Sequence, residues 1–165
     1  MSKVKRSDFA TFLDTSGSST PTWSRMGKGI TSQKISYNAA TSSETYIDED
    51  TATTTIESYA PTLDAPQTAY AGDAVFDYVD GLRQARAIGA DAETDILLVY
   101  LYDSTTSSST TSYRAEKQKV SIQIDDFGGD GGASNVLNYT LNFIGDATPG
   151  SCTITSGVPT FTADP

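Results

Sequence analysis

The chain has 165 residues, no histidine and a single cysteine, Cys152. The lack of histidine removes the commonest general base and metal ligand, and with them every Ser-His or Cys-His nucleophile pair. A single cysteine excludes an internal disulfide and a CxxC metal site, so we expect Cys152 to be a buried or half-buried structural thiol. Because no residues assemble a catalytic constellation, we predict no enzymatic activity and no catalytic, cofactor-binding or metal-binding residue.

Long apolar runs are also missing. The first 20 residues contain no apolar stretch typical of a signal peptide. The longest apolar run, 96–102, is far too short to cross a bilayer. We therefore expect a soluble protein that is made in a cytosol and has no membrane anchor.

Basic residues are few and unevenly placed. The chain has 11 Lys and Arg against 21 Asp and Glu, a net charge of −10. Residues 1–34 hold six basic and two acidic residues, a net of +4, which leaves −14 for the other 131. The acidic body argues against nucleic acid as a bound ligand, because phosphate affinity comes from Lys and Arg. The basic segment is either a solvated tail or a strap that docks onto the acidic body of a neighbour.

Abundant Thr, Ser and Tyr favour strands. The segment 93–103 is apolar on both faces, which predicts the most buried strand, covered on both sides. Two prolines in 60–70 place any strand there at an edge. Nine consecutive Ser and Thr residues, 104–112, predict a mobile surface loop. Period-two alternation predicts further strands at 30–39, 43–50, 51–60, 113–125, 134–146 and 151–156.

One segment has helical spacing. Apolar residues recur every three to four positions over about 73–86, with Asp73 as a cap at the start and Gly89 available to end the helix. Residues 1–20 show neither period and predict a flexible arm in which Phe9, Phe12 and Leu13 are possible anchor points. We therefore expect an arm over 1–20 and a single, mostly β domain over 21–165.

The glycine-rich stretch DDFGGDGGASN, 125–135, lies between two predicted strands. Glycine supplies the positive φ angles of tight reversals, so the stretch is interpreted as a hairpin tip without a bound metal. The alternative is a calcium site with Asp125, Asp126 and Asp130 as ligands, but the ligand spacing of a helix–loop–helix calcium site is absent.

A second acidic cluster comprises Asp48, Glu49 and Asp50. Clustered carboxylates bind metals or transfer protons, but a solvated turn between two strands is the simpler interpretation. The aromatic residues form no stacking platform for bases. Nine of them are expected at core-like positions: Trp23, Tyr37, Tyr46, Tyr59, Tyr70, Phe76, Tyr78, Tyr100 and Phe143.

Four stretches in order resemble the tail tube proteins, or major tail proteins, of long-tailed bacteriophages and related prophages. They are SSETYIDEDTATTTIESYAPTLD (42–64), TAYAGDAVFDYVDGLR (68–83), GADAETDILLVYLYD (89–103) and YRAEKQKVSIQIDDFGGDGG (113–132). The resemblance covers most of residues 22–155 and is weakest at 1–20 and 104–112. None of these motifs is catalytic.

The resemblance implies a two-sheet β-sandwich flanked by one α-helix. Six copies would close into a ring in which one sheet of each copy joins a continuous barrel, and rings would stack into a tube. The implied partners are further copies of the chain, a tape-measure protein in the lumen, and terminator and distal tail or baseplate proteins at the ends. DNA would pass through without specific binding. The implied location is the virion, after assembly in the cytoplasm of the bacterial host, with no cofactor and no active site.

Two other functions stay open at this point. The same fold builds the inner tubes of contractile tails and of secretion or injection machines. A stand-alone β-sandwich adhesion module is the second alternative, and it would remain monomeric.

Overall fold

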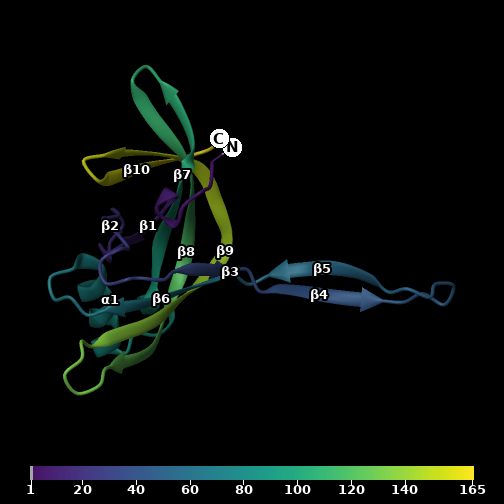
Figure 1. Ribbon diagram of the computed structural model, residues 1–165, viewed down its shortest axis with the longest axis horizontal. Coiled ribbons are helices and arrows are strands. Elements are labelled where there is room, and N and C mark those ends of the chain that lie inside the picture. The colour runs from purple at the N-terminus through teal and green to yellow at the C-terminus, as the bar shows by residue number, and fades with distance from the viewer. Residues whose placement is uncertain (1) are drawn as a thin grey trace.

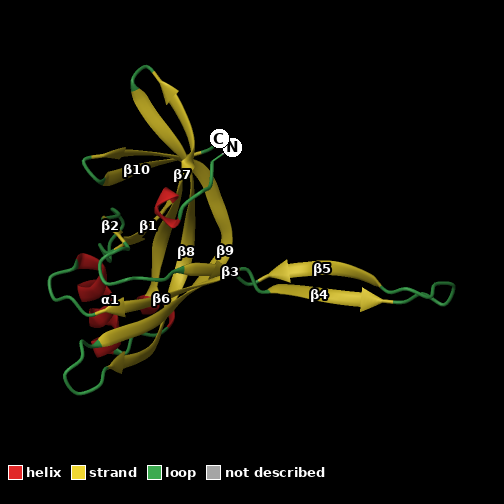
Figure 2. Cartoon of the chain, viewed as in Figure 1, coloured by secondary structure: helices red, strands yellow, loops and turns green. Residues whose placement is uncertain are grey.

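The computed structural model describes residues 2–165, and its fold is mainly β with one α-helix and two sheets, as predicted (Figure 1, Figure 2). The helix α1 spans Ala74–Ala85, and two 3-10 turns span Arg6–Asp8 and Gly89–Ala92. The ten strands are β1 (Phe9–Asp14), β2 (Trp23–Arg25), β3 (Lys34–Ser36), β4 (Ala39–Glu44), β5 (Thr53–Tyr59), β6 (Thr62–Thr68), β7 (Glu93–Ser107), β8 (Thr110–Gly128), β9 (Val136–Thr155) and β10 (Val158–Ala163).

One eight-stranded antiparallel sheet forms the body. Its order is β2-β1-β7-β8-β9-β6-β3, and β10 pairs with the far end of β9. The second sheet contains only β4 and β5. Because β7, β8 and β9 have 15, 19 and 20 residues, they extend from the helix-covered half to the opposite end of the body (Figure 1).

The body sheet is packed on both faces. On one face, Val75 and Val79 of α1 cover Ile96 and Leu98 of β7. On the other face, Leu97 packs with residues of β1, β2, β8, β9 and β10, so the edge strand β2 and the last strand β10 meet there. Residues 96–99 are at most 2% exposed, which confirms the predicted most buried strand.

The helix confirms the predicted range of about 73–86 at both ends, and Arg86 rather than Gly89 ends it. The Asp73 side chain accepts a hydrogen bond from the Phe76 N–H and caps the first turn. Arg86 ends the helix in the left-handed conformation, with φ +51°, and its N–H returns to the carbonyls of Leu82 and Arg83.

The N-terminal segment contradicts the prediction that residues 1–20 have no strand. Phe9–Asp14 form β1, which pairs with β7 from Phe9↔Tyr100 to Leu13↔Ile96. Phe12 and Leu13 are 1% and 0% exposed. They are core residues of the domain itself, because β1 lies one strand in from the sheet edge formed by β2.

The serine- and threonine-rich segment is the second correction. Residues 104–107 continue β7 and residues 110–112 begin β8, so only Ser108 and Ser109 form the turn. Likewise, 151–155 is the end of β9 and no separate strand, and the last strand, β10, lies in the proline-containing tail.

The expected edge strand at 60–70 is β6, and only half of it lies at an edge. β3 covers Thr62–Asp64, whereas a single bridge, Ile30↔Gln67, touches the rest. The Thr68 N–H donates to the Gly29 carbonyl, away from β9. The backbone nitrogen of Pro66, two residues earlier, also points away from β9. Its missing N–H therefore removes no hydrogen bond to β9.

Candidate assembly surfaces

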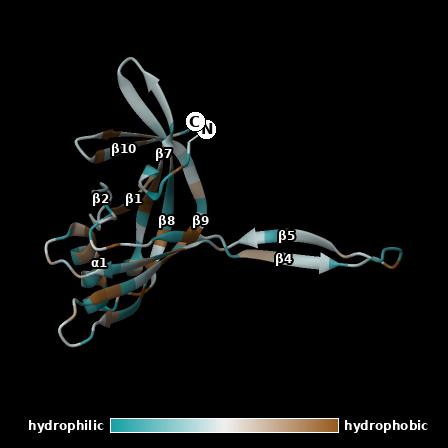
Figure 3. Ribbon diagram, viewed as in Figure 1, coloured by the Kyte–Doolittle hydropathy of each residue, from teal (hydrophilic) through white to brown (hydrophobic). Residues whose placement is uncertain are grey.

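The β4–β5 hairpin projects far from the body (Figure 1). The prediction of a strand over 43–50 is wrong, because β4 ends at Glu44 and 45–52 form the connection. Of the strand predicted at 30–39, only Lys34–Ser36 form β3. β5 matches its prediction, but all seven of its residues are exposed, and in β4 only Ser42 is partly covered. The hairpin is mostly white and teal in Figure 3, whereas hydrophobic segments gather in the body.

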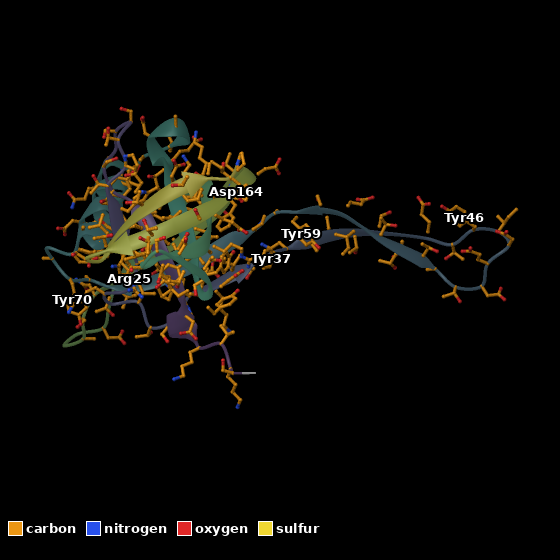
Figure 4. The ribbon with its side chains drawn as sticks, turned by 90° about the horizontal axis from the view of Figure 1, so that it is seen from above. Arg25, Tyr37, Tyr46, Tyr59, Tyr70 and Asp164 are labelled. Atoms are coloured by element: carbon orange, nitrogen blue, oxygen red, sulfur yellow. The ribbon has the colours of Figure 1, made fainter. Side chains whose placement is uncertain are left out.

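A hydrogen-bonded junction sets the exit of the hairpin. Asn38 has φ +46°, and its side-chain amide donates to the Ala60 carbonyl at 3.0 Å. The rings of Tyr37 and Tyr59 meet edge to face, 6.4 Å between centroids. Both tyrosines lie where the hairpin leaves the body (Figure 4). The chain therefore fixes the direction of a hairpin that packs against nothing in the monomer.

The far end of the hairpin combines acidic and apolar side chains. Asp48, Glu49 and Asp50 are exposed, as the turn interpretation expects. Beside them Ile47 is fully exposed, and Tyr46, at the end in Figure 4, is 56% exposed. We call residues 46–50 the hairpin tip.

Exposed tyrosines correct the expectation that the aromatics lie at core positions. Phe76 is buried, and Trp23, Tyr78, Tyr100 and Phe143 are partly buried. Exposed aromatic residues that were expected in the core are Tyr37, Tyr46, Tyr59 and Tyr70, at 45–58%.

The glycine-rich stretch forms a hairpin end, as predicted. β8 runs to Gly128 and β9 starts at Val136, and they pair antiparallel. Asp125 accepts hydrogen bonds from Gln123 and Thr140, and Asp126 accepts one from Asn138 at 2.7 Å. These two carboxylates therefore link β8 to β9. In residues 2–165, no three Asp, Glu or Cys side chains lie close enough to hold a metal ion.

A polar pocket of about 180 Å³ lies beside β1 and β2. Arg6 and Arg25 both line it, and no acidic side chain does. The Arg6 guanidinium donates to the Gln33 side-chain oxygen at 2.7 Å and packs over the Phe9 ring at 5.1 Å. Burial, followed by the nearby positive charge of Arg25, lowers the pKa of Arg6. We call this site the arginine pocket.

The ion pairs of residues 2–165 all involve basic residues beyond position 34. They join Arg83 to Asp80, Arg114 to Asp103, Lys117 to Asp95 and Lys119 to Glu93. Within residues 2–165, none of the six basic residues of 1–34 forms an ion pair with a carboxylate. The charge split seen in the sequence is thus not neutralised within one copy.

The chain matches no protein-family model and no curated protein. Among solved structures, its fold is similar to that of a chain in the tail of an empty GTA particle, determined with helical refinement and C6 symmetry. The TM-score is 0.60 at 12% identity, over 88% of this chain and 98% of that chain. At this identity the likeness shows a shared fold. No helix of residues 2–165 is long and apolar enough to span a membrane.

The sequence singled out the residues of the hairpin tip and the basic segment, but it did not show their arrangement. The sequence predicts a solvated turn at Asp48, Glu49 and Asp50, but it places Tyr46 and Ile47 in a strand over 43–50. Arg6 and Arg25 come together only because β1 pairs with β2. The signal that pointed toward them was the unequal distribution of charge.

Proposed function

We propose that this chain is a structural subunit of a phage-like tail, and that six copies close into a ring that stacks with others into a tube. The shared fold with a chain of a C6-symmetric tail supports the six-fold ring. The tape-measure, terminator and baseplate proteins, the virion location, assembly in the bacterial cytoplasm and the passage of DNA belong to the same proposal.

The exposed hairpin is the observation that carries this proposal. A two-stranded hairpin alone in water is marginally stable, because it buries too little apolar surface. In β4 and β5 the strands pair along their length, yet no side chain is buried. A partner surface would supply the missing burial, and a second copy of the chain is the partner that a ring provides.

The edges of the body sheet support the same conclusion. Unpaired strands invite further pairing, which folded proteins normally suppress or use. β2 and β3, at the two ends of the sheet, have only three residues each, so they cover only Phe12–Asp14 of β1 and Thr62–Asp64 of β6. In a closed ring every such edge has a neighbour.

The acidic polar face of β6, β9 and β8 suits a conduit for DNA. The Thr140 hydroxyl lies within hydrogen-bond distance of both Asp64 and Asp125, at 3.1 and 2.9 Å, and all three side chains are outside the core. Like charge discourages phosphates from binding to a wall of this kind.

Electron microscopy of the purified chain, together with sedimentation velocity, tests the proposal. We expect rings or tubes from the full chain, and folded monomers when residues 41–57 are replaced by Asn-Gly. A full chain that stays monomeric at every concentration contradicts the proposal and favours the monomeric adhesion module. A tube that binds a sheath protein identifies the inner tube of a contractile tail or an injection machine.

A further inference from the structure

The hairpin carries charge of one sign only. Residues 39–59 contain five acidic residues and no basic one. Three of the five lie at the tip, beside the exposed Ile47. Neighbouring like charges repel, and neither the body nor the hairpin supplies a cation near them, because the tip lies far from the body (Figure 4).

The arginine pocket has the complementary composition. Arg6 and Arg25 give it two guanidinium groups, and Phe9, Met26 and Ile30 contribute apolar lining. Within residues 2–165 the Arg25 side chain makes no hydrogen bond and no ion pair. Arg6 is instead fixed in place, because Gln33 is 7% exposed and its oxygen also accepts from Thr11. An acidic segment with an apolar side chain therefore fits this pocket in charge and in chemistry.

The two surfaces lie on different sides of one copy. β2 and the labelled Arg25 are on the body, away from the side where the hairpin leaves it (Figure 1, Figure 4). The tip therefore cannot reach the pocket of its own copy. Contacts between two different surfaces of identical subunits are head-to-tail, and they close into a ring or grow as a filament.

We infer that the hairpin tip of one copy docks in the arginine pocket of the next copy, with Asp48, Glu49 and Asp50 facing Arg6 and Arg25 and Ile47 in the apolar part. This inference rests on the proposed self-assembly and names the surface that receives the hairpin. Opposite charges in a partly desolvated contact fix register and steer association more than they add affinity.

Two neutral variants test the contact. One carries Arg6→Gln and Arg25→Gln, and the other carries Asp48→Asn, Glu49→Gln and Asp50→Asn. Each removes one side of the contact, so each should raise the concentration needed for assembly by roughly tenfold. When the two variants are mixed, one intact tip and one intact pocket remain per pair. At a concentration where each variant alone stays monomeric, we expect 1:1 dimers in sedimentation velocity and no growth beyond them.

The matched controls remove the same charge elsewhere. Arg86→Gln with Lys34→Gln removes two positive charges, and Asp91→Asn, Asp130→Asn and Asp146→Asn remove three negative ones, all at exposed sites. Both controls should assemble like the parent, and circular dichroism should show that all variants fold. If the parent assembles and the pocket variant assembles equally well, the pocket serves another anionic ligand and the inference is wrong while the proposed function stands. If the parent never assembles, both fail.

Discussion

Gln67 joins three parts of the fold through one fully buried side chain. Its amide nitrogen donates to the Lys28 carbonyl and to Asp73, each at 3.0 Å, and its oxygen accepts from the Tyr139 hydroxyl at 3.0 Å. Burial raises the pKa of Tyr139, so that the hydroxyl keeps its proton and remains a donor. Asp73 in turn caps α1, so the network ties the helix to β6 and β9.

Replacing Gln67 by Leu should lower the free energy of unfolding by about 2–4 kcal/mol, because the Tyr139 hydroxyl and the Lys28 carbonyl lose their partner in the core. Urea denaturation of the monomer measures the change. Gln84→Leu, on the exposed side of α1, should change stability by less than about 0.5 kcal/mol. Equal effects of the two substitutions would show that the network contributes nothing.

Cys152 is 0% exposed, as expected of a structural thiol. Burial raises the pKa of this thiol, which keeps it protonated, and the protonated form is the unreactive one. A maleimide at neutral pH should therefore label Cys152 only as fast as the protein unfolds. A cysteine placed at the exposed Thr160 in a Cys152→Ser background should react at once. Rapid labelling of native Cys152 would contradict the packing around it.

At the scale of single elements, the β7–β8 turn shows what composition alone leaves out. Runs of Ser and Thr are typical of mobile loops, but Thr also favours strands, and here the ladder continues to Ser107↔Thr110. The extension is decided by the pairing of β7 with β8. The ladder includes the apolar halves of the two strands and continues from there into the Ser and Thr residues. The helix was predictable because its cap, period and charge order are all local.

Ser108 and Ser109 have φ angles of +47° and +71° in a two-residue turn, where serine is strained. Changing them to Asn and Gly should stabilise the monomer by about 0.4–1 kcal/mol and raise its Tm by roughly 1–4 °C. Scanning calorimetry measures the shift. The same pair placed at Thr105 and Thr106, inside the strand, should lower Tm. A rise in both variants would mean that residues 104–112 are a loop after all.

At the scale of the whole molecule, deletions separate the end of the chain from its core. Residues 2–4 are exposed, whereas Phe12 and Leu13 are buried by β7. Removing 2–4 should leave Tm unchanged. Removing 2–14 discards the core side chains of Phe12 and Leu13, worth about 5–10 kcal/mol together, which is close to the whole stability of a domain. Circular dichroism should then show an unfolded or aggregated chain. Native Tm in the longer deletion would restore the flexible-arm interpretation.

The strand β1 was not predictable from the sequence, because the residues that bury it are more than 80 positions away. Its apolar side chains gave no alternation long enough to identify a strand. The hairpin β4–β5 shows the converse limit. Its strand propensity was visible, but the exposure of both faces depends on the direction set at Asn38. The overall class was predictable from strand count and the single helix, since these depend on local patterns.

The pairing of β1 with β7 also has a consequence for synthesis on the ribosome. Leu13 emerges first, but its partner Ile96 follows 83 residues later. At about 5–20 residues per second, that gap lasts roughly 4–17 s. β6 waits almost as long for β9, because Leu141 follows its partner Leu63 by 78 residues. A chain cut short during translation therefore cannot complete the body, although it can already carry the entire acidic hairpin, and only finished chains can offer both halves of a head-to-tail contact.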